Sequence, residues 1–509
     1  MIVLAALLAA VQGTVLVLPP EGPPGRPEPW VSELVAEQLP RSLGFLGPPA
    51  VDRADRLQAH AALEIPLVTL TRATSIRMAE ALGASRVVTG AYAVDGSTLT
   101  LSLQLLDVER GVLGAPMVAK GAIDTAPDLV DGLAWDIVLA VAPPPLRTRD
   151  ELFALRNGVS FEAARMLAEG LGARGPAVRI RTVRRALTLA PAFHPARLAL
   201  GRLLLDQREF SAAYATLGRI PAEAPVWRTA RFLQGVALLE VGRYREAATL
   251  YAGLAASQPT SAALNNQALA LLRDGDRGTR AVDVLRQAAA MSPDSLDIAF
   301  NLGWALIVEG EPEAAVKTLR DLATRAPLDR HLRLLVAWGL GLAGRTSEQE
   351  EEWKAVAALA PGFETQTRPD LTRRFERIRL SERGYEAERE TRTSTELAAS
   401  LEARAQRLHD SGDTEGALKE ATRALFLDSH DRKTHLLLAR LHRLRGALEL
   451  SLAEFRVFLW SNDEPVVRVE VALLLRDMGR GPEARLEAEK ALKLDPANEQ
   501  ARRLLETPE

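Results

Sequence analysis

The hydrophobic and polar positions follow one pattern in the first quarter of the chain and another in the remainder. Within the first quarter, four leucines alternate with polar residues, at Leu99, Leu101, Leu103 and Leu105. This alternation is typical of a strand with one buried and one solvated face, and Asp95 with Gly96 supplies the tight turn of a hairpin. From about residue 159 onward the apolar positions follow a helical period instead.

Residues 14–142 are predicted to form a small α/β domain around this hairpin. The expected strands are Thr14–Leu18, Pro66–Leu70 and Met117–Ile123, and the expected helices are Trp30–Leu43, Ala54–Leu63, Ala73–Leu82 and Leu129–Val141. Three successive prolines then predict an extended linker over residues 143–158, because proline cannot continue the preceding helix.

Six prolines in the remainder are spaced 34 residues apart: Pro191, Pro225, Pro259, Pro293, Pro327 and Pro361. Small residues repeat in phase with them, in one column of Gly201, Gly235 and Gly303 and another of Ala213, Ala247, Ala281 and Ala315. Small side chains let two helices approach closely, and proline ends the second helix of each pair. A strict 34-residue repeat therefore predicts antiparallel helix pairs stacked into a solenoid.

Two segments show the repeat most clearly, FLQGVALLEVGRYREAATLYAGLAASQP and NLGWALIVEGEPEAAVKTLRDLATRAP, and they resemble tetratricopeptide repeats. The resemblance implies a right-handed superhelix of helix hairpins whose concave groove holds peptides or partner proteins. The spacing predicts six repeats in residues 159–361, three repeats in 397–498 and a C-terminal cap over 499–509. The charged stretch 362–396 between the two groups is expected to be a degenerate repeat or a hinge, and a mobile joint with helical segments is the favoured interpretation.

The run ALGASRVVTGAYAVDGSTLTLSLQLLDVERGVL resembles the small α/β domain of bacterial envelope proteins of the TolB N-terminal and FlgO-like type. Such domains often precede tetratricopeptide arrays. They are binding or assembly modules, so the resemblance implies no catalytic chemistry.

Composition and motifs argue against several classes of function. The net charge is −3 and no basic stripe is interleaved with aromatic residues, so nucleic-acid binding is not expected. The absence of cysteine removes disulfides, thiolate metal sites and cysteine nucleophiles. No phosphate-binding, dinucleotide-binding, zinc-protease or serine-hydrolase motif occurs, and nothing completes a metal site around His435 and His442. We therefore predict no catalytic residue, no cofactor and no metal.

Residues 1–13, MIVLAALLAAVQG, form a short apolar run that ends in small residues. The run is too short to span a bilayer as a helix, and it resembles the apolar core of a secretory signal cut after Gly13. This favours a periplasmic or cell-envelope protein with no membrane span in its mature chain. No basic residue follows Met1, so the alternative is a retained first element of the α/β domain in a cytoplasmic protein.

The candidate binding residues lie on the first helices of the repeats. Trp304 and Trp338 are 34 residues apart, and in the tetratricopeptide family this position faces the concave surface. An apolar strip with two asparagines for an extended peptide backbone is expected there: Phe232, Asn266, Phe300, Asn301, Trp304, Leu334 and Trp338. On this hypothesis, replacing both tryptophans with alanine abolishes partner binding and leaves melting nearly unchanged. The alternative is that both tryptophans fill space between hairpins or against the charged insert.

These observations predict a mainly α protein, in which a tetratricopeptide α-solenoid follows a small α/β domain. The expected function is a non-enzymatic interaction scaffold or adaptor of the bacterial cell envelope, with a peptide or protein partner in the groove. A second envelope component would dock on the α/β domain. The alternatives are a cytoplasmic regulatory scaffold and, least favoured, an enzyme activated by a partner.

Overall fold

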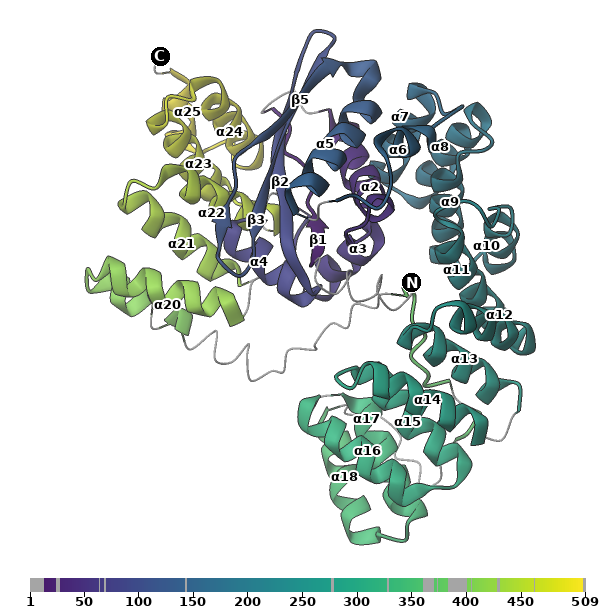
Figure 1. Cartoon of the computed structure of the whole chain (residues 1–509). Coiled ribbons are helices and arrows are strands. Elements are labelled where there is room, and N and C mark those ends of the chain that lie inside the picture. Colours follow the sequence, from purple (N-terminus) through teal and green to yellow (C-terminus); the bar gives the residue numbers. More distant parts are fainter. Residues whose placement is uncertain are drawn as a thin grey trace. The chain divides into compact units, whose positions relative to one another are not determined.

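The computed structural model describes residues 13–23, 28–63, 65–67, 70–141, 144–275, 279–326, 329–359, 370–372, 374–382, 401–403, 405–427, 431–461 and 463–506. The chain divides into two compact units (Figure 1). Unit 1 comprises residues 1–155 and 392–509, and unit 2 comprises residues 156–391. The predicted signal, residues 1–13, lies outside the described residues except for Gly13.

Unit 1 contains a five-stranded sheet. Its strands are β1 Thr14–Val17, β2 Ala84–Asp95, β3 Thr98–Asp107, β4 Val112–Leu113 and β5 Met117–Ala122. β1 pairs with β2 in parallel, whereas β3 pairs antiparallel with β2, β4 and β5. The β2–β3 hairpin turns at Gly96, whose φ of 58° favours glycine. Leu99, Leu101 and Leu103 are buried, as the alternation predicts, whereas Leu105 is only half-buried and Leu106 is buried instead.

The helices of this α/β part are α2 Pro29–Leu46, α3 Arg53–Ala62, α4 Arg72–Ala81, α5 Ala126–Val141 and α6 Arg149–Ala154, with a short 3₁₀ turn at Ile123–Thr125. α2 and α5 pack together around a buried polar network, in which Gln38 and Ser42 both donate to the Asp131 carboxylate, at 2.8 and 2.7 Å. Because these hydrogen bonds satisfy the buried Asp131 carboxylate, the network holds the two helices together.

The strand expected at Pro66–Leu70 is not formed at the described positions of that stretch. The chain before it folds back onto α3 instead. The Ile65 N–H donates to the His60 carbonyl at 2.7 Å, and the His60 ring bonds the Ile65 carbonyl at 3.0 Å. These backbone groups are therefore not available to a sheet partner.

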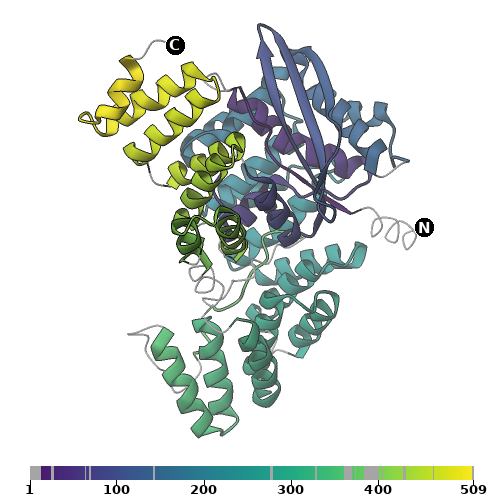
Figure 2. The ribbon, with the colours of Figure 1, turned by 90° about the vertical axis from the view of Figure 1, so that its left-hand side faces the viewer.

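Unit 1 also contains the C-terminal helices, which Figure 2 shows as antiparallel pairs. A helix over residues 401–403 and 405–410 precedes α20 Thr414–Leu427, and it is followed by α21 Arg432–Leu444, α22 Leu448–Ser461, α23 Pro465–Asp477, α24 Gly481–Leu494 and α25 Glu499–Glu506. His435 on α21 pairs with the buried Glu454 on α22 at 2.6 Å. His435 therefore has a packing role between two helices.

Unit 2 consists of helix hairpins that follow one another along the chain (Figure 1). Its helices are α7 Phe161–Gly172, α8 Pro176–Leu189, α9 His194–Asp206, α10 Phe210–Leu217, α11 Trp227–Glu240, α12 Tyr244–Ser257, α13 Ser261–Arg273, α14 Thr279–Met291, α15 Leu296–Glu309, α16 Pro312–Arg325, α17 Arg330–Leu342 and α18 Thr346–Leu359. The glycine column marks close helix contacts. A Cβ on Gly201, Gly235 or Gly303 would lie 2.3, 2.4 or 2.3 Å from the side chain 16 residues later in the chain.

Of the charged stretch 362–396, the structure describes residues 370–372 and 374–382. Helical segments are expected in this stretch, but these residues contain none, and residues 374–379 have no regular secondary structure. The physical reason is that the backbone groups of Arg377 and Arg379 bond to asparagine side chains of unit 2, as described below, and not to groups of a helix. Within the described parts of the chain, no helix is long and apolar enough to cross a membrane.

Candidate functional site

Residues 374–382, the groove segment, lie against the first helices of four consecutive hairpins in unit 2. We call the surface formed by α11, α13, α15 and α17 the groove. Aromatic side chains, asparagines and charged residues of these helices each contact a different part of the segment.

Phe375 lies in an aromatic pocket between α15 and α17. Its ring centroid is 5.3 Å from that of Trp304 and 5.5 Å from that of Trp338, with interplanar angles of 67° and 80°. The His331 ring is 5.9 Å away on a third side. These edge-to-face contacts are the geometry that aromatic pairs prefer, and each is worth roughly 0.5–1.5 kcal/mol beyond the apolar area that it buries.

Two buried asparagines bind the segment backbone. Asn301 donates from Nδ2 to the Arg377 carbonyl and accepts at Oδ1 from the Arg377 N–H, both at 2.9 Å. Asn266 does the same with Arg379, at 2.8 and 2.9 Å. One amide side chain thus satisfies both backbone groups of a residue, and it does so at two alternate residues of an extended chain.

The two asparagines are held in place by other side chains. Asn265 donates to Asn266 Oδ1 at 3.1 Å and accepts from Asn301 Nδ2 at 2.8 Å, and it also donates to the Arg377 carbonyl at 3.1 Å. Tyr251 donates to the Phe232 carbonyl at 3.0 Å and accepts from Asn266 at 3.1 Å. Burial raises the pKa of Tyr251, so its hydroxyl stays protonated. This network fixes which amide atom faces the segment.

The arginines of the segment face carboxylates of the groove. Arg377 pairs with Asp297 at 3.2 Å and with the buried Asp329, and its guanidinium lies 3.8 Å from the ring centroid of Phe300. Arg379, itself buried, pairs with Asp297 at 3.4 Å. Guanidinium groups stack on aromatic faces and bond carboxylates at once, which a lysine ammonium does less well.

Two glutamates of the segment pair with arginines of the groove. Glu376 bonds Arg273 at 2.6 Å. Glu382 accepts two hydrogen bonds from Arg228 on α11, at 3.0 and 2.8 Å. Phe375, near the start of the segment, contacts α17, whereas Glu382, at its end, contacts α11. The segment therefore passes the repeats in the reverse of their order along the chain.

Five of the seven residues predicted for the groove contact the segment: Asn266, Phe300, Asn301, Trp304 and Trp338. Phe232 and Leu334 belong to the hydrophobic core of unit 2. Both tryptophans are fully buried and pack against the charged insert through Phe375. This packing is the alternative considered for them, and it predicts that the double alanine variant melts at a lower temperature than the wild-type chain.

Sequence reasoning missed the groove segment itself and the charged side chains of the groove. We call the groove side chains that contact the segment the wall. The groove residues missed are Arg228, Asn265, Arg273, Asp297, Asp329 and His331, and the segment contributes Phe375, Arg377 and Arg379. One signal is visible in the printed sequence, because Phe375 is an aromatic residue inside a charged stretch. Its partners come from separate repeats, so their proximity depends on the superhelix.

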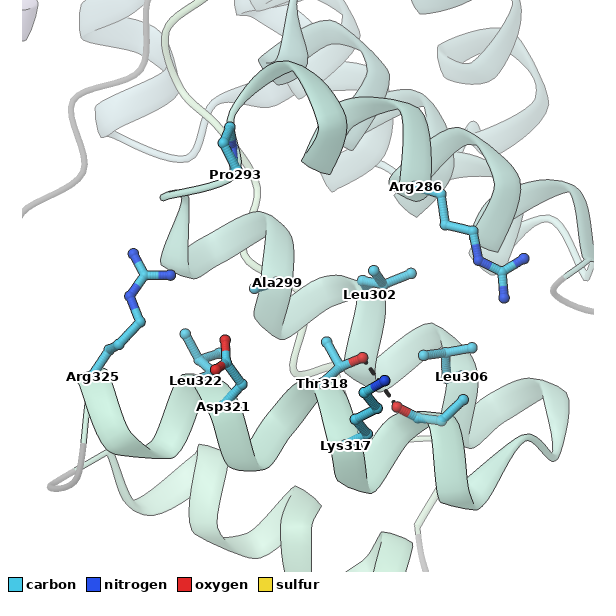
Figure 3. Close-up of a pocket in the computed structure, with 11 residues that line it drawn as sticks. Arg286, Pro293, Ala299, Leu302, Leu306, Lys317, Thr318, Asp321, Leu322 and Arg325 are labelled. Atoms are coloured by element: carbon cyan, nitrogen blue, oxygen red, sulfur yellow. Dashed lines mark hydrogen bonds between the residues drawn. The ribbon is translucent and has the colours of Figure 1, made fainter.

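A second hollow, of about 580 Å³, lies between α14, α15 and α16 (Figure 3). Ala299 and Leu302 contribute to its wall, and Lys317 and Asp321 to its rim. Thr318 in this hollow is bonded to its own helix, at the Ala314 carbonyl. No group of three or more His, Asp or Glu side chains within the described ranges is placed to hold a metal ion.

Comparisons with known proteins agree with the helix pairs. Two tetratricopeptide-repeat family models match the chain, one at residues 198–262 and 232–277 and the other at 272–339. Residues 198–339 thus match tetratricopeptide repeats. The chain is mainly helical, with helix hairpins typical of a tetratricopeptide solenoid and a small sheet domain before them, and the finer resemblance of that domain to the TolB and FlgO-like type stays a prediction.

Several solved structures match the chain at low sequence identity. A tetratricopeptide repeat protein from Parabacteroides merdae is 12% identical, with 55% of this chain and 99% of that one covered and a TM-score of 0.35. MamA from Desulfovibrio magneticus is 15% identical over 33% and 96%, with a TM-score of 0.31. YrrB, described as having an unusual peptide-binding site, is 13% identical over 36% and 93%, with a TM-score of 0.30. No curated protein matches the chain.

Proposed function

We propose that the protein is a non-enzymatic scaffold whose groove in unit 2 binds an extended peptide of a protein partner. The observation that carries the proposal is the pair of backbone clamps made by Asn266 and Asn301. A side chain that bonds both the N–H and the carbonyl of one residue fits an extended chain, because in a helix those groups are already bonded internally.

The chemistry of the groove supports binding and not turnover. Asn265, Arg273 and Asp297 of the groove are bonded to the backbone or to opposite charges of the segment, which is the arrangement of a recognition surface. Buried aromatic side chains next to charged residues are typical of the few positions that dominate binding energy at interfaces.

The test uses the full chain and a library of displayed random peptides. Peptides selected on the full chain with F375A/R377E/R379E, in which the competing segment is weakened, should lose binding by about tenfold or more when Asn266→Ala/Asn301→Ala is added, since each asparagine supplies a backbone clamp. Asp321→Ala, on the rim of the second hollow, is the matched control and should leave binding unchanged when it is added instead. Selected peptides that bind the double variant undiminished would place the site elsewhere.

We further propose that the scaffold works in the bacterial cell envelope, with the α/β domain docking a second component. The support is the apolar run of residues 1–13, which resembles the apolar core and the small-residue end of a secretory signal. Intact mass after fractionation of a bacterial host tests this. A periplasmic species that begins at or near Thr14 is expected, whereas a cytoplasmic species retaining Met1 would favour the regulatory-scaffold alternative.

A further inference from the structure

We infer that the groove selects extended peptides in which an aromatic residue is followed by arginine at the second and fourth positions after it, and that residues 374–382 occupy this site until such a peptide of a partner displaces them. The inference rests on the proposed function and names the class of ligand. Within the chain itself, Phe375, Arg377 and Arg379 form this pattern.

The first step is the alternation along the segment. In an extended chain, residues at positions i, i+2 and i+4 point to the same side. Phe375, Arg377 and Arg379 occupy these positions, and the side chain of each contacts the groove wall. The asparagine clamps bond backbone atoms only, so they accept any sequence. Selectivity must therefore come from contacts with side chains of the segment, and Phe375, Arg377 and Arg379 share the face whose contacts are described next.

The second step is the aromatic pocket. Trp304 and Trp338 flank the Phe375 ring edge-to-face, so an aliphatic residue would lose both aromatic contacts. Within the described residues, Trp304 Nε1 is buried and has no hydrogen-bond partner. A partner peptide that brings an acceptor to this nitrogen gains a hydrogen bond that the groove segment does not make, which favours displacement.

The third step is the charge of the wall. Asp297 faces both Arg377 and Arg379, and Asp329 faces Arg377. Asp329 is buried and also caps α17 by accepting from the His331 and Leu332 N–H groups, which fixes its position. An acidic residue at either arginine position would be repelled by buried or half-buried carboxylates.

The fourth step is the covalent link between segment and groove. Because both belong to one chain, the segment competes at an effective concentration on the order of millimolar, as linked binding modules do. A free peptide of equal affinity would be excluded from the wild-type groove at micromolar concentration. The groove segment therefore sets a minimum affinity for the groove, and only a peptide that binds more tightly or a multivalent partner displaces the segment.

The binding experiment uses the synthetic peptide LTRRFERIRLSER, which has the sequence of residues 371–383, and the full chain with F375A/R377E/R379E. These changes weaken the groove segment and leave every wall residue intact. By fluorescence anisotropy, the labelled peptide should bind this variant about tenfold or more tightly than it binds the wild-type chain. Peptides with Phe→Ala, or with both arginines changed to Glu, should bind the variant about tenfold or more weakly.

Each other outcome overturns a stated part. If the variant is folded and binds a scrambled peptide equally well, the groove binds peptides but the aromatic–arginine selectivity is wrong. If the folded variant binds neither this peptide nor the peptides selected by display, the proposed function fails as well. If the variant loses the helix content of unit 2, the segment is a permanent part of the fold, and displacement is wrong.

A second measurement detects displacement directly. The chain has no cysteine, so Leu380→Cys gives a single labelling site, and this exposed position faces away from the wall. A nitroxide there should report an immobilised segment in the full chain. Saturating peptide should convert the spectrum to a mobile one when Phe375→Ala weakens the segment. A spectrum that stays immobilised while peptide binds would show that the peptide occupies a different site.

Discussion

Asn301 on α15 and Arg377 exchange two hydrogen bonds of 2.9 Å, one from the side-chain amide to the backbone carbonyl and one in the reverse direction. The two residues are 76 positions apart in the chain. This pair replaces the strand-to-strand bonds that an extended backbone makes in a sheet with bonds to a single side chain.

The Asn301→Ala change removes both of these bonds and also the bond from Asn301 to Asn265. We expect a loss of about 1–3 kcal/mol in the free energy that holds the segment, since buried polar groups are left unsatisfied. Hydrogen exchange followed by mass spectrometry should show faster exchange at residues 375–379. Asp321→Ala should leave that exchange unchanged, and equal protection in both variants would contradict the clamp.

The Trp338→Ala change should destabilise unit 2 by about 3–5 kcal/mol, because a fully buried indole leaves a cavity. The half-buried Trp135 in the α/β part provides the control, and its alanine variant should leave the stability of unit 2 unchanged. Urea unfolding followed by hydrogen exchange in unit 2 measures both. Trp338→Phe, which keeps an aromatic ring, should recover part of the loss. A stability of unit 2 that is unchanged in Trp338→Ala would restore the expectation of a free groove surface.

The Gly235→Ala change tests the support behind the clamp. Its Cβ would lie 2.4 Å from the Tyr251 ring, so that ring must move. Tyr251 bonds Asn266, and we therefore expect the Arg379 clamp to weaken although Gly235 itself lies away from the segment. Faster exchange at Arg379, with a smaller change at Arg377, is the predicted pattern. Gly253→Ala is the matched control, because an added Cβ there meets nothing within 4 Å.

Salt should release the segment. Its ion pairs with Arg228, Arg273 and Asp297 are partly exposed, so screening weakens them. Raising ionic strength from about 0.05 M to about 0.5 M should increase the mobility of a nitroxide at Leu380→Cys. Sucrose at matched viscosity is the control. No change in mobility across this range would mean that the aromatic pocket and the amide clamps alone hold the segment.

The α/β part should lose stability in mild acid through His60. Burial lowers the pKa of His60 to about 4, with nearby Arg56 acting in the same direction, against 6.5 for the exposed group. Between these values the unfolded chain binds the proton and the folded chain does not, so unfolding becomes more favourable as pH falls. The stabilisation is complete above pH 6.5, and about 3 kcal/mol of it is lost by pH 4.

Hydrogen exchange of residues 84–107 over this pH range, corrected for intrinsic rates, measures the effect. His60→Asn keeps a donor for the Ile65 carbonyl and should flatten the pH dependence. An unchanged slope in His60→Asn would assign the acid sensitivity to other groups.

The sequence predicts the repeat solenoid well because its signals are periodic. A proline, a glycine and an alanine recur every 34 residues, and each indicates a helix end or a close contact between two helices. Both features depend only on residues within one hairpin. The two tryptophans of the groove follow from the same period, once the resemblance assigns a concave face to the first helices, whereas Asn266 and Asn301 are 35 residues apart and are predicted only as neighbours of the apolar strip.

The occupant of the groove could not be predicted in this way. Residues 374–382 fall where the periodic pattern is lost, and their high charge favours an exposed joint when each residue is considered alone. Their extended conformation depends on partners in four different hairpins, such as Arg228 and Asp329, which come together only in the assembled superhelix. Partners this far apart in the sequence leave no local pattern that identifies them.

The two clamps also relate the spacing of the repeats to the spacing of residues in the bound chain. Asn301 lies on α15 and Asn266 on α13, so one step between neighbouring repeats corresponds to two residues of the bound chain, from Arg377 to Arg379. Side chains of an extended chain alternate with a period of two, so the clamps on α13 and α15 bind residues on the same face of the bound chain. A ligand with one residue inserted between the two clamped positions would turn its arginines toward solvent on one side of the insertion. The groove therefore selects a peptide by the number of residues between its two clamped positions as well as by its side chains.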